Sequence, residues 1–574
     1  MLTRPSTAVA AVLFLAAVCV APASSRSSDT LRATTDHFVF YADESVTDAD
    51  VVSAADRAEG VYERLARFLG RAPGGDRVSC TLYPTLEAKG LATGYTLPAH
   101  AMPGSGEVFA AVEPGFDGEA ERALAWLLIR RALGRPRVEF LEAGLAMHFT
   151  KDWRGTGYQY WAARIGTADG SADLGRLFDN RRLASESDLV VRPLAGAFVD
   201  WAIDAYGREN FLEKYEAWEP APGETARLET DWRAWLERLH RTEVVARADT
   251  PGLPGFHRGF CYAHEGYQIH NGYISARSDA ALEKLQSLGV NAVSITPFTY
   301  MRNPGAAAPL PFSQHAGAEN DEGVIHAAMT ARRLGMSVMI KPHVWIRGGW
   351  PGDVEMATEA EWSEFFEHYW RWIRHYALLC EMYDLEMLCI GVELERTSGA
   401  QAARWRELIS RVRSIYGGRI TYAANWGGEV ESLSFWDALD YIGVNCYYPL
   451  SDERTPDDAA LREGVKRALD RIEEVARHND KPVIITEVGF VSAPAPWVKP
   501  YERDRRAAPD EDAQSRCYEA FLEGLVGRAS IEGVYWWKWP SFLEYGGPRH
   551  SGFTPNGKAA EGVVKKWFTG ELDG

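Results

Sequence analysis

Basic side chains and long apolar runs are both scarce in this chain of 574 residues. It has 62 Lys and Arg against 80 Asp and Glu, which gives a formal net charge of −18. Nucleic acids and anionic membranes are bound by basic surface, so this balance argues against both as partners. After residue 23 no segment is apolar over the ~20 positions that a membrane-spanning helix needs, so we expect no membrane insertion.

Cysteine is also rare, with seven in the whole chain. The six cysteines after residue 23 match no metal-binding spacing, so no metal site is predicted from them. Cys261, Cys389 and Cys446 fall in predicted strands, and we interpret them as small buried hydrophobes.

The first 23 residues have the pattern of a secretory signal peptide. Arg4 precedes an apolar stretch over residues 8–20, and Ala21-Pro22-Ala23 matches a cleavage site of small residues. We therefore expect a secreted or periplasmic protein. A lipid anchor on Cys19 is not favoured, because Val18 is bulky where a small residue is expected.

A stretch rich in Pro and Gly divides the remaining chain in two. Residues 244–258 have no apolar period and are predicted to be a linker. Residues 30–243 are predicted to form a smaller α+β domain. Its expected strands are 36–41 and 78–84, and its expected helices are 50–69, 119–133 and 139–150.

Residues 259–570 alternate apolar strands with amphipathic helices. Eight strands are predicted, at 259–263, 292–296, 337–341, 387–392, 420–423, 441–446, 483–486 and 533–537. Eight βα units over roughly 300 residues predict an α/β fold, a (β/α)₈ TIM barrel. The alternative, an open doubly wound sheet, is not favoured because no Gly-rich phosphate loop follows the first strand.

Two of these strands carry a glutamate at their carboxyl end. Glu393 follows the fourth strand and Glu487 ends the seventh. The carboxyl ends of barrel strands form the catalytic face, and glycoside hydrolysis needs two carboxylates beside the scissile bond. A lone glutamate in so acidic a chain is more often structural, but a pair at two barrel strand ends favours catalysis. Glu395, two residues later, is the alternative to Glu393.

Several motifs of this half, in their order and spacing, resemble glycoside hydrolase family 113, the retaining β-mannanases of the clan A barrels. They include GVNAV at 289–293, PFTY at 297–300, KPHV at 341–344, CIGVEL at 389–394, TYAANW at 421–426, YYPL at 447–450 and TEVGF at 486–490. The resemblance implies that Glu393 is the acid/base, that Glu487 is the nucleophile, and that Tyr447 donates a hydrogen bond to the nucleophile.

The other strand ends are expected to form the substrate-binding walls. The candidates are Lys341 and His343 after the third strand, Asn425 and Trp426 after the fifth, and Trp537 or Trp539 in the eighth. Strand alternation points both tryptophans the same way, so the sequence does not choose between them. His343 fits a buried structural histidine equally well, and Trp345 and Trp350 form either an outer wall or loop packing.

Two positions depart from the clan A pattern. Val392 stands where an Asn usually precedes the acid/base, and Asn445 stands where the sixth-strand motif usually has Asp. The catalytic pair is intact, but mannan as the substrate is left open. We expect an exported, retaining, endo-β-1,4-mannanase-like hydrolase of polysaccharides or oligosaccharides. It needs no cofactor, because the two carboxylates carry the reaction. The alternatives are a non-catalytic glycan-binding barrel and a glycosidase for another glycan.

Residues 30–243 resemble a degenerate gluzincin-type metallopeptidase domain. The resemblance rests on the motif FLEAGLA at 140–146, which opens a helix. The preceding helix, over 123–131, contains no His, and Ala143 stands in the place of the third zinc ligand. Zinc needs three protein ligands, so the resemblance implies a pseudo-peptidase. A zinc peptidase with an accessory barrel is the remaining alternative.

Overall fold

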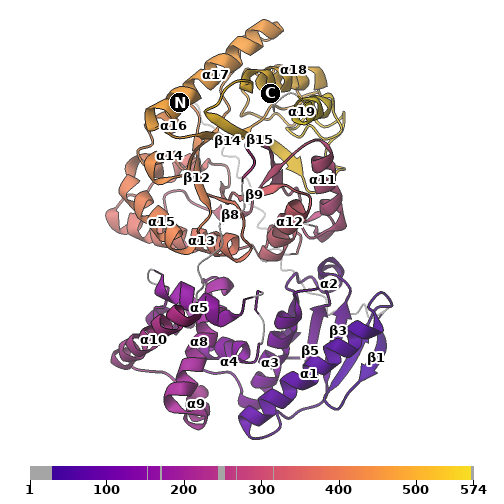
Figure 1. Ribbon diagram of the computed structural model, residues 1–574, viewed down its shortest axis with the longest axis vertical. Helices are drawn as coiled ribbons and strands as arrows, with labels where there is room; N and C mark the ends of the chain where they lie inside the picture. Colours follow the sequence, from indigo (N-terminus) through magenta and orange to yellow (C-terminus); the bar gives the residue numbers. More distant parts are fainter. Residues whose placement is uncertain are drawn as a thin grey trace, which may run out of the picture.

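The computed structural model describes residues 29–150, 153–154, 156–168, 171–243, 253–266, 268–313 and 316–570. The predicted signal peptide and residues 244–252 of the predicted linker lie outside the described residues, so both stay predictions. Two lobes are visible in Figure 1. The lobe drawn in indigo and magenta is the N-terminal half, and the lobe drawn in red to yellow is the C-terminal half.

The N-terminal lobe begins with a five-stranded mixed sheet in the order β1-β2-β3-β5-β4, in which the two edge strands are antiparallel. The strands are β1 (Thr30–Thr34), β2 (Phe38–Ala42), β3 (Val78–Tyr83), β4 (Ala99–Met102) and β5 (Glu107–Ala111). The predicted strands at 36–41 and 78–84 correspond to β2 and β3, whereas the short strands β1, β4 and β5 were not predicted.

Helix α1 (Asp48–Leu69) shows how sequence fixes local structure in this lobe. Thr47 and Asp50 form a capping box at its start, and Gly70 ends it with a left-handed φ of 69°. Apolar residues three or four positions apart, from Val51 to Leu65, are buried in the lobe's core.

The remaining helices of this lobe pack beside the sheet and around α8. They are α2 (Leu86–Thr93), α3 (Asp117–Leu133), α4 (Glu139–His148), α5 (Tyr158–Thr167), α6 (Leu174–Leu177), α7 (Asn180–Leu183), α8 (Asp188–Tyr206), α9 (Arg208–Tyr215) and α10 (Pro222–Glu243). The α+β architecture expected for residues 30–243 is thus observed, with more helix than the sequence predicted.

The C-terminal lobe is a closed barrel of eight parallel strands, which confirms the predicted TIM barrel. The strands are β6 (His257–Ala263), β7 (Ala292–Ile295), β9 (Ser337–Ile340), β11 (Met387–Val392), β12 (Arg419–Asn425), β13 (Tyr441–Asn445), β14 (Val483–Val488) and β15 (Ile531–Pro540). Their side chains fill the barrel interior, which includes Cys261, Met339, Cys389 and Tyr535.

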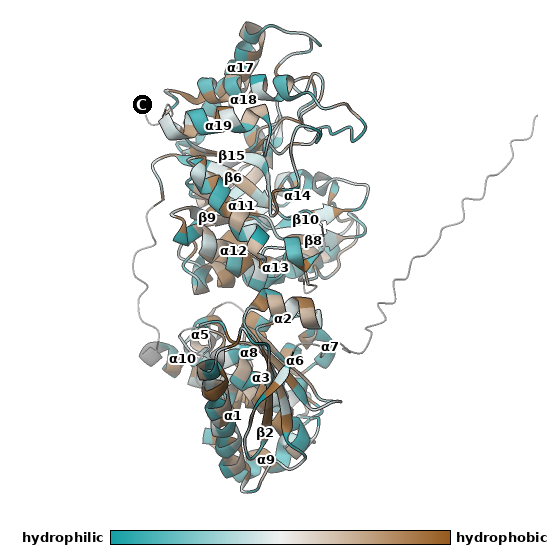
Figure 2. Cartoon of the chain, turned by 90° about the vertical axis from the view of Figure 1, so that its right-hand side faces the viewer, coloured by the Kyte–Doolittle hydropathy of each residue, from teal (hydrophilic) through white to brown (hydrophobic). Residues whose placement is uncertain are grey.

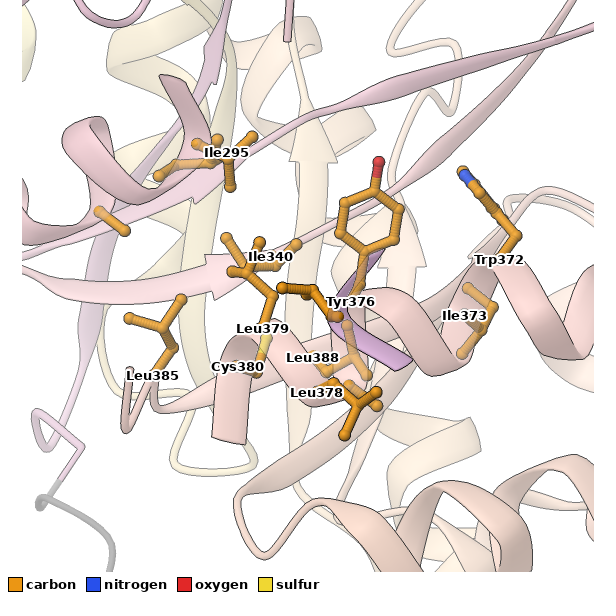
Figure 3. Packing of buried hydrophobic residues seen from close by; sticks show 14 of the residues in the cluster. Ile295, Ile340, Trp372, Ile373, Tyr376, Leu378, Leu379, Cys380, Leu385 and Leu388 are labelled. Atoms are coloured by element: carbon orange, nitrogen blue, oxygen red, sulfur yellow. The ribbon is translucent and has the colours of Figure 1, made fainter. Parts of the chain in front are cut away.

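Helices cover the outside of the barrel. They are α11 (Ala276–Ser287), α12 (Asp321–Arg333), α13 (Glu359–Met382), α15 (Ala402–Ile415), α17 (Asp458–Asn479), α18 (Glu511–Leu525) and α19 (Ala559–Gly570), with short helices η1 (Ile269–Asn271), η2 (Pro351–Asp353), α14 (Glu395–Ala400), α16 (Glu429–Ser432) and η3 (Trp436–Ala438). Figure 3 shows one part of this core, where side chains of α13 such as Tyr376 and Leu379 face Ile295, Ile340 and Leu388 of three strands.

A small parallel sheet of two strands, β8 (Phe298–Met301) and β10 (His343–Ile346), extends from the loops after β7 and β9. It carries residues that follow two barrel strands at their carboxyl ends. This sheet was not predicted from the sequence, and it forms part of one wall at the barrel mouth.

The two lobes meet at α12 and α13, as Figure 2 shows for the view turned by 90°. Arg374 of α13 donates to Glu186 at 2.5 Å, and both side chains are at most 10% exposed. His375 contacts Ser187 of the N-terminal lobe at 2.7 Å and Asp321 of its own lobe at 2.7 Å. Further contacts across the interface are Arg164–Glu381, Arg154–Tyr383, Arg176–Glu367 and Asn320–Thr96. These polar contacts are joined by an apolar cluster in which Leu86 of the N-terminal lobe packs with Ile269 and Ile274 of the barrel lobe.

All six cysteines in the described part of the chain are free and buried, which agrees with the interpretation of Cys261, Cys389 and Cys446 as small buried hydrophobes. Among the helices of the described residues, none is both long and apolar enough to cross a membrane.

Candidate functional site

A cavity of about 540 Å³ opens at the carboxyl ends of the barrel strands, and it contains both predicted glutamates. Glu393 lies directly after β11, and Glu487 is the penultimate residue of β14. Asn445 of β13 is the register partner of Glu487, and its side chain donates to Glu393, so this residue links the two carboxylates. The structure thus brings the predicted pair together.

Glu487 is held on both of its carboxylate oxygens. Lys341 Nζ donates to Oε1 at 2.6 Å, and Tyr447 Oη donates to Oε2 at 2.9 Å. Burial and then the charge of Glu487 raise the pKa of Tyr447 well above its ordinary value, so this phenol keeps its proton and donates. A cation and a phenol donor both favour the carboxylate form, which is the form that a nucleophile needs.

Among the described residues, the hydrogen-bond donors to the Glu393 carboxyl group are both neutral. Trp350 Nε1 donates to Oε2 at 2.7 Å, and Asn445 Nδ2 donates to Oε1 at 2.8 Å. Burial and then the neighbouring charge of Glu487 raise the pKa of Glu393, and the two hydrogen bonds offset part of that rise. A carboxyl group whose pKa is raised keeps its proton to higher pH, which suits a general acid.

The backbone of Glu393 takes a left-handed conformation with φ of 50°, which is uncommon for a residue other than glycine. Its own amide donates to Ala423 O, and the next amide, of Leu394, donates to Tyr422 Oη, each at 2.9 Å. These hydrogen bonds hold the turn after β11 that directs the carboxyl group into the cavity.

His343 and Trp537 line the cavity beside Glu487. Their rings stack with centroids 5.8 Å apart, and His343 Nε2 lies 3.7 Å from Glu487 Oε1. Burial, with Lys341 and Lys538 nearby, lowers the pKa of His343 well below its ordinary value, so the ring is neutral. Its Nε2 is buried and has no hydrogen-bond partner among the described residues.

Asn425 and Trp426, which follow β12, also line the cavity as predicted. Trp426 stacks on Tyr501 with ring centroids 5.7 Å apart, and Tyr501 comes from the long loop after β14. Flat aromatic faces of this kind pack well against the C–H faces of sugar rings.

Lys341 and Trp539, two of the predicted substrate-binding residues, do not line the cavity, and both are fully buried. Lys341 lies behind Glu487, so it acts on the carboxylate and not on the substrate. Trp539 points outward to Ala281 of α11, because a register shift between Trp537 and Trp539 breaks the expected alternation. Glu395, the alternative to Glu393, lies in α14 outside the cavity lining.

Sequence reasoning missed several residues of the cavity. Asn445 was noted only as a departure from the family pattern, Trp350 only as a wall or a packing residue and Phe298 only within a family motif, and Tyr501 and Phe553 were not singled out. Asn445 ends barrel strand β13, whereas the four aromatic residues come from loops and from the two-stranded sheet. The strand pattern could not place them, although the aromatic content of residues 345–350 and 497–501 was a usable signal.

The N-terminal lobe contains the two helices expected from its resemblance, but their polar residues are used differently. Arg130 of α3 makes two hydrogen bonds to Glu142 of α4, at 2.6 and 2.5 Å. Within the described part of the chain, no three His, Cys, Asp or Glu side chains are grouped to hold a metal ion. The carboxylate of the FLEAGLA motif is thus paired with a guanidinium group.

A TIM barrel that holds one carboxylate beside a cation and a second one with a raised pKa in the same cavity has the site of a glycoside hydrolase. The model of Glycoside Hydrolase Family 113 matches residues 262–558, just over half of the chain, and the chain belongs to this family. The match does not extend to the N-terminal lobe, so its gluzincin-like character stays a prediction.

Solved structures similar to this chain include a complex of a family 113 β-1,4-mannanase, 26% identical with a TM-score of 0.49, covering 55% of this chain and 100% of that one. A family 113 β-mannanase from Alicyclobacillus acidocaldarius is 28% identical with a TM-score of 0.49, covering 55% of this chain and 98% of that one. A family 5 mannosidase from Rhizomucor miehei is 14% identical with a TM-score of 0.40, covering 56% of this chain and 94% of that one. A comparison with curated proteins finds no match.

Proposed function

We propose that this protein is a retaining β-glycosidase that cleaves mannan or a related polysaccharide within the chain. The observation that carries the proposal is the contrast between the two carboxylates. Glu487 is paired with Lys341 and Tyr447, whereas Glu393 has neutral donors only. This contrast supports one carboxylate as nucleophile and the other as acid, which is the division of labour in retaining enzymes.

In the proposed reaction Glu487 attacks the anomeric carbon, and the bond from that carbon to the leaving oxygen breaks. Glu393 gives its proton to the leaving oxygen in the same step. Glu393, now a carboxylate, then takes a proton from water, whose oxygen displaces Glu487 and releases the sugar with its original stereochemistry. His343 and Asn425 are placed to bind hydroxyl groups, and Trp537 to lie against the sugar ring.

Mannan is proposed because the family resemblance implies β-mannanases. Cleavage within the chain is supported by half-exposed aromatic side chains on two walls of the cavity, Trp345 on one side and Trp426 with Tyr501 on the other. Val392 lines the cavity where clan A enzymes usually have an Asn. Because this position departs from the clan A pattern, glycans other than mannan should be tested too.

A panel of polysaccharides tests the proposal: mannan, glucomannan, galactomannan, xylan, β-glucan and galactan, each with wild-type protein and with Glu487→Ala. Release of reducing ends from mannans that is lost in the variant is the expected result. Cleavage of a glycan other than mannan that is lost in Glu487→Ala would support the mechanism and exclude mannan as the substrate. Glycan binding without turnover on any substrate would favour a non-catalytic binding protein.

We also propose that residues 30–243 are a pseudo-peptidase domain that holds no zinc. Two observations support this: Ala143 stands in the place of the third zinc ligand, and the neighbouring carboxylate of Glu142 is paired with Arg130. Metal analysis of the full chain after zinc loading tests it, and one tightly bound zinc per chain would contradict it.

Export is proposed from the signal-peptide pattern of residues 1–23. Expression of the full chain followed by fractionation and N-terminal sequencing tests it. A mature chain that starts near Ser24 outside the cytoplasm is expected, and an uncleaved chain in the cytoplasm would contradict it.

A further inference from the structure

Trp350 contacts the acid/base carboxyl group directly, although it comes from a loop and not from a barrel strand. Its indole Nε1 donates to Oε2 of Glu393 at 2.7 Å, and the ring also lines the cavity. Asn445 donates to the other oxygen, and no Lys or Arg among the described residues forms an ion pair with Glu393. Each oxygen of this carboxyl group therefore has one neutral donor in addition to its access to the cavity.

The loop is built to place this indole ring. Gly348 has a left-handed φ of 70°, and a Cβ at Gly352 would lie 2.3 Å from two ring atoms of Trp350. Gly352 itself does not have a left-handed φ, so the ring is what requires a glycine there. Arg396 of α14 donates to Glu355 at 2.7 Å, which ties the far end of the loop to the helix that starts two residues after Glu393.

We propose that Trp350 is a positioning residue for the acid/base, holding Oε2 of Glu393 toward the leaving-group oxygen and stabilising the carboxylate that forms when the proton is transferred. The inference rests on the proposed function of Glu393. The indole N–H is a neutral donor that does not ionise near neutral pH, so it binds the Glu393 carboxyl group without acting as a competing acid. The glycosidic oxygen reaches the carboxyl group from the cavity side.

The direction of the effect follows from the hydrogen bond. A donor stabilises the ionised form, so removing it raises the pKa of Glu393 further, and the acid form then persists to higher pH. A hydrogen bond to a charged group shifts the pKa of that group by roughly one to two pH units. Loss of the Trp350 contact should therefore move the basic limb of the kcat/KM profile upward by about one pH unit.

Two variants test this by different routes. Trp350→Phe keeps an aromatic ring but removes the N–H, and Gly352→Ala keeps the indole but displaces it. Both should shift the basic limb upward, and the double variant should shift it no further than Trp350→Phe alone. Trp345→Phe is the matched control, because this Trp lines the same cavity without a contact to Glu393, so it can weaken substrate binding but should leave the limb in place.

A basic limb that stays at the wild-type pH in both active variants would overturn the proposal. It would then leave Trp350 as a wall of the cavity only.

A second measurement needs no turnover. In ¹⁵N-labelled protein the indole signal of Trp350, assigned by its absence in Trp350→Phe, should move with pH as Glu393 ionises. In Glu393→Gln the same signal should not titrate. A Trp350 signal that does not titrate in wild type, or that titrates equally in Glu393→Gln, would overturn the proposal. A signal that titrates in a protein with no activity on any glycan would support the contact and overturn the proposed function instead.

Discussion

Both lobes bury carboxylates, but they provide them with different partners. In the N-terminal lobe Glu142 is bound by Arg130, and Glu119 by Arg192 at 3.0 and 3.1 Å, so each charge is neutralised by a guanidinium group. In the barrel, the donors to Glu393 among the described residues are an indole and an amide, and a second carboxylate lies nearby. A buried carboxylate satisfied by arginine is part of the structure, whereas one left with neutral donors in a cavity is available for chemistry.

The sharpest test of this difference compares one glutamate from each lobe. Glu487→Ala should reduce kcat by about four orders of magnitude or more, because the nucleophile is lost, and it should also lower the free energy of unfolding, because the buried Lys341 loses its charged partner. Glu142→Gln should leave kcat unchanged but lower the free energy of unfolding by about 2 kcal/mol, because Arg130 loses its charged partner. Turnover on the active glycan and denaturant unfolding measure the two effects.

Azide sharpens the result for the nucleophile. A small anion should fill the space left in Glu487→Ala and restore product formation with inverted stereochemistry. A product with retained configuration would show that Glu487 is not the nucleophile.

The second prediction concerns Glu393, whose loss should depend on the substrate. Glu393→Ala should slow cleavage of polysaccharides by roughly 10²–10⁴-fold, because their leaving groups need a proton. Aryl glycosides with good leaving groups should be affected much less in the first step. In the wild-type enzyme activity should fall as pH rises through the raised pKa of Glu393, since the acid form disappears, and Glu393→Ala should lose this basic limb. An equal loss on both substrates, with the limb intact, would contradict the assignment.

The barrel and the meeting of Glu393 and Glu487 in one cavity could be predicted from the sequence, since each buried parallel strand appears as an apolar run and each glutamate stands at the end of one. All eight strands were found where they were expected. Trp539 shows the limit of such reasoning, because one shift of register in β15 turned a predicted binding residue into a core residue. Trp350 shows another limit, since the contact of a loop residue with Glu393 depends on a close approach that no periodicity encodes.

The N-terminal lobe was harder to predict for a related reason. Its strands are short and its edge strands are partly exposed, so they give weak patterns. The contacts between lobes, such as Arg374 with Glu186, join residues 188 positions apart and leave no local signal in the sequence.

The third prediction tests whether a contact between the lobes contributes more to the free energy of unfolding than a surface ion pair does. Arg374→Ala should lower the free energy of unfolding by about 3 kcal/mol, because it leaves Glu186 buried without its cation. Arg137→Ala is the matched control: its pair with Glu219 is about two-thirds exposed, and its loss should cost under about 1 kcal/mol. Denaturant unfolding of the full chain measures both. Equal losses would mean that the interface contributes no more than the surface does.

The smallest effect is expected at Lys89, a fully buried lysine of the N-terminal lobe whose amine donates to Tyr95 O at 3.1 Å. Burial lowers its pKa to about 7, and the charge of Glu322 from the barrel offsets part of that shift. Between pH 7 and the ordinary pKa of 10.5 the unfolded chain binds more protons than the folded one, so stability should rise with pH across this range. Lys89→Met should therefore stabilise the protein by roughly 2 kcal/mol at neutral pH, with a gain that shrinks toward pH 10.

Thermal unfolding at several pH values checks this. The exposed Lys466→Met is the control, and its difference in stability from wild type should not change with pH over this range. A loss of stability in Lys89→Met at pH 7 would show that the hydrogen bond to Tyr95 and the charge of Glu322 outweigh the cost of burying the amine.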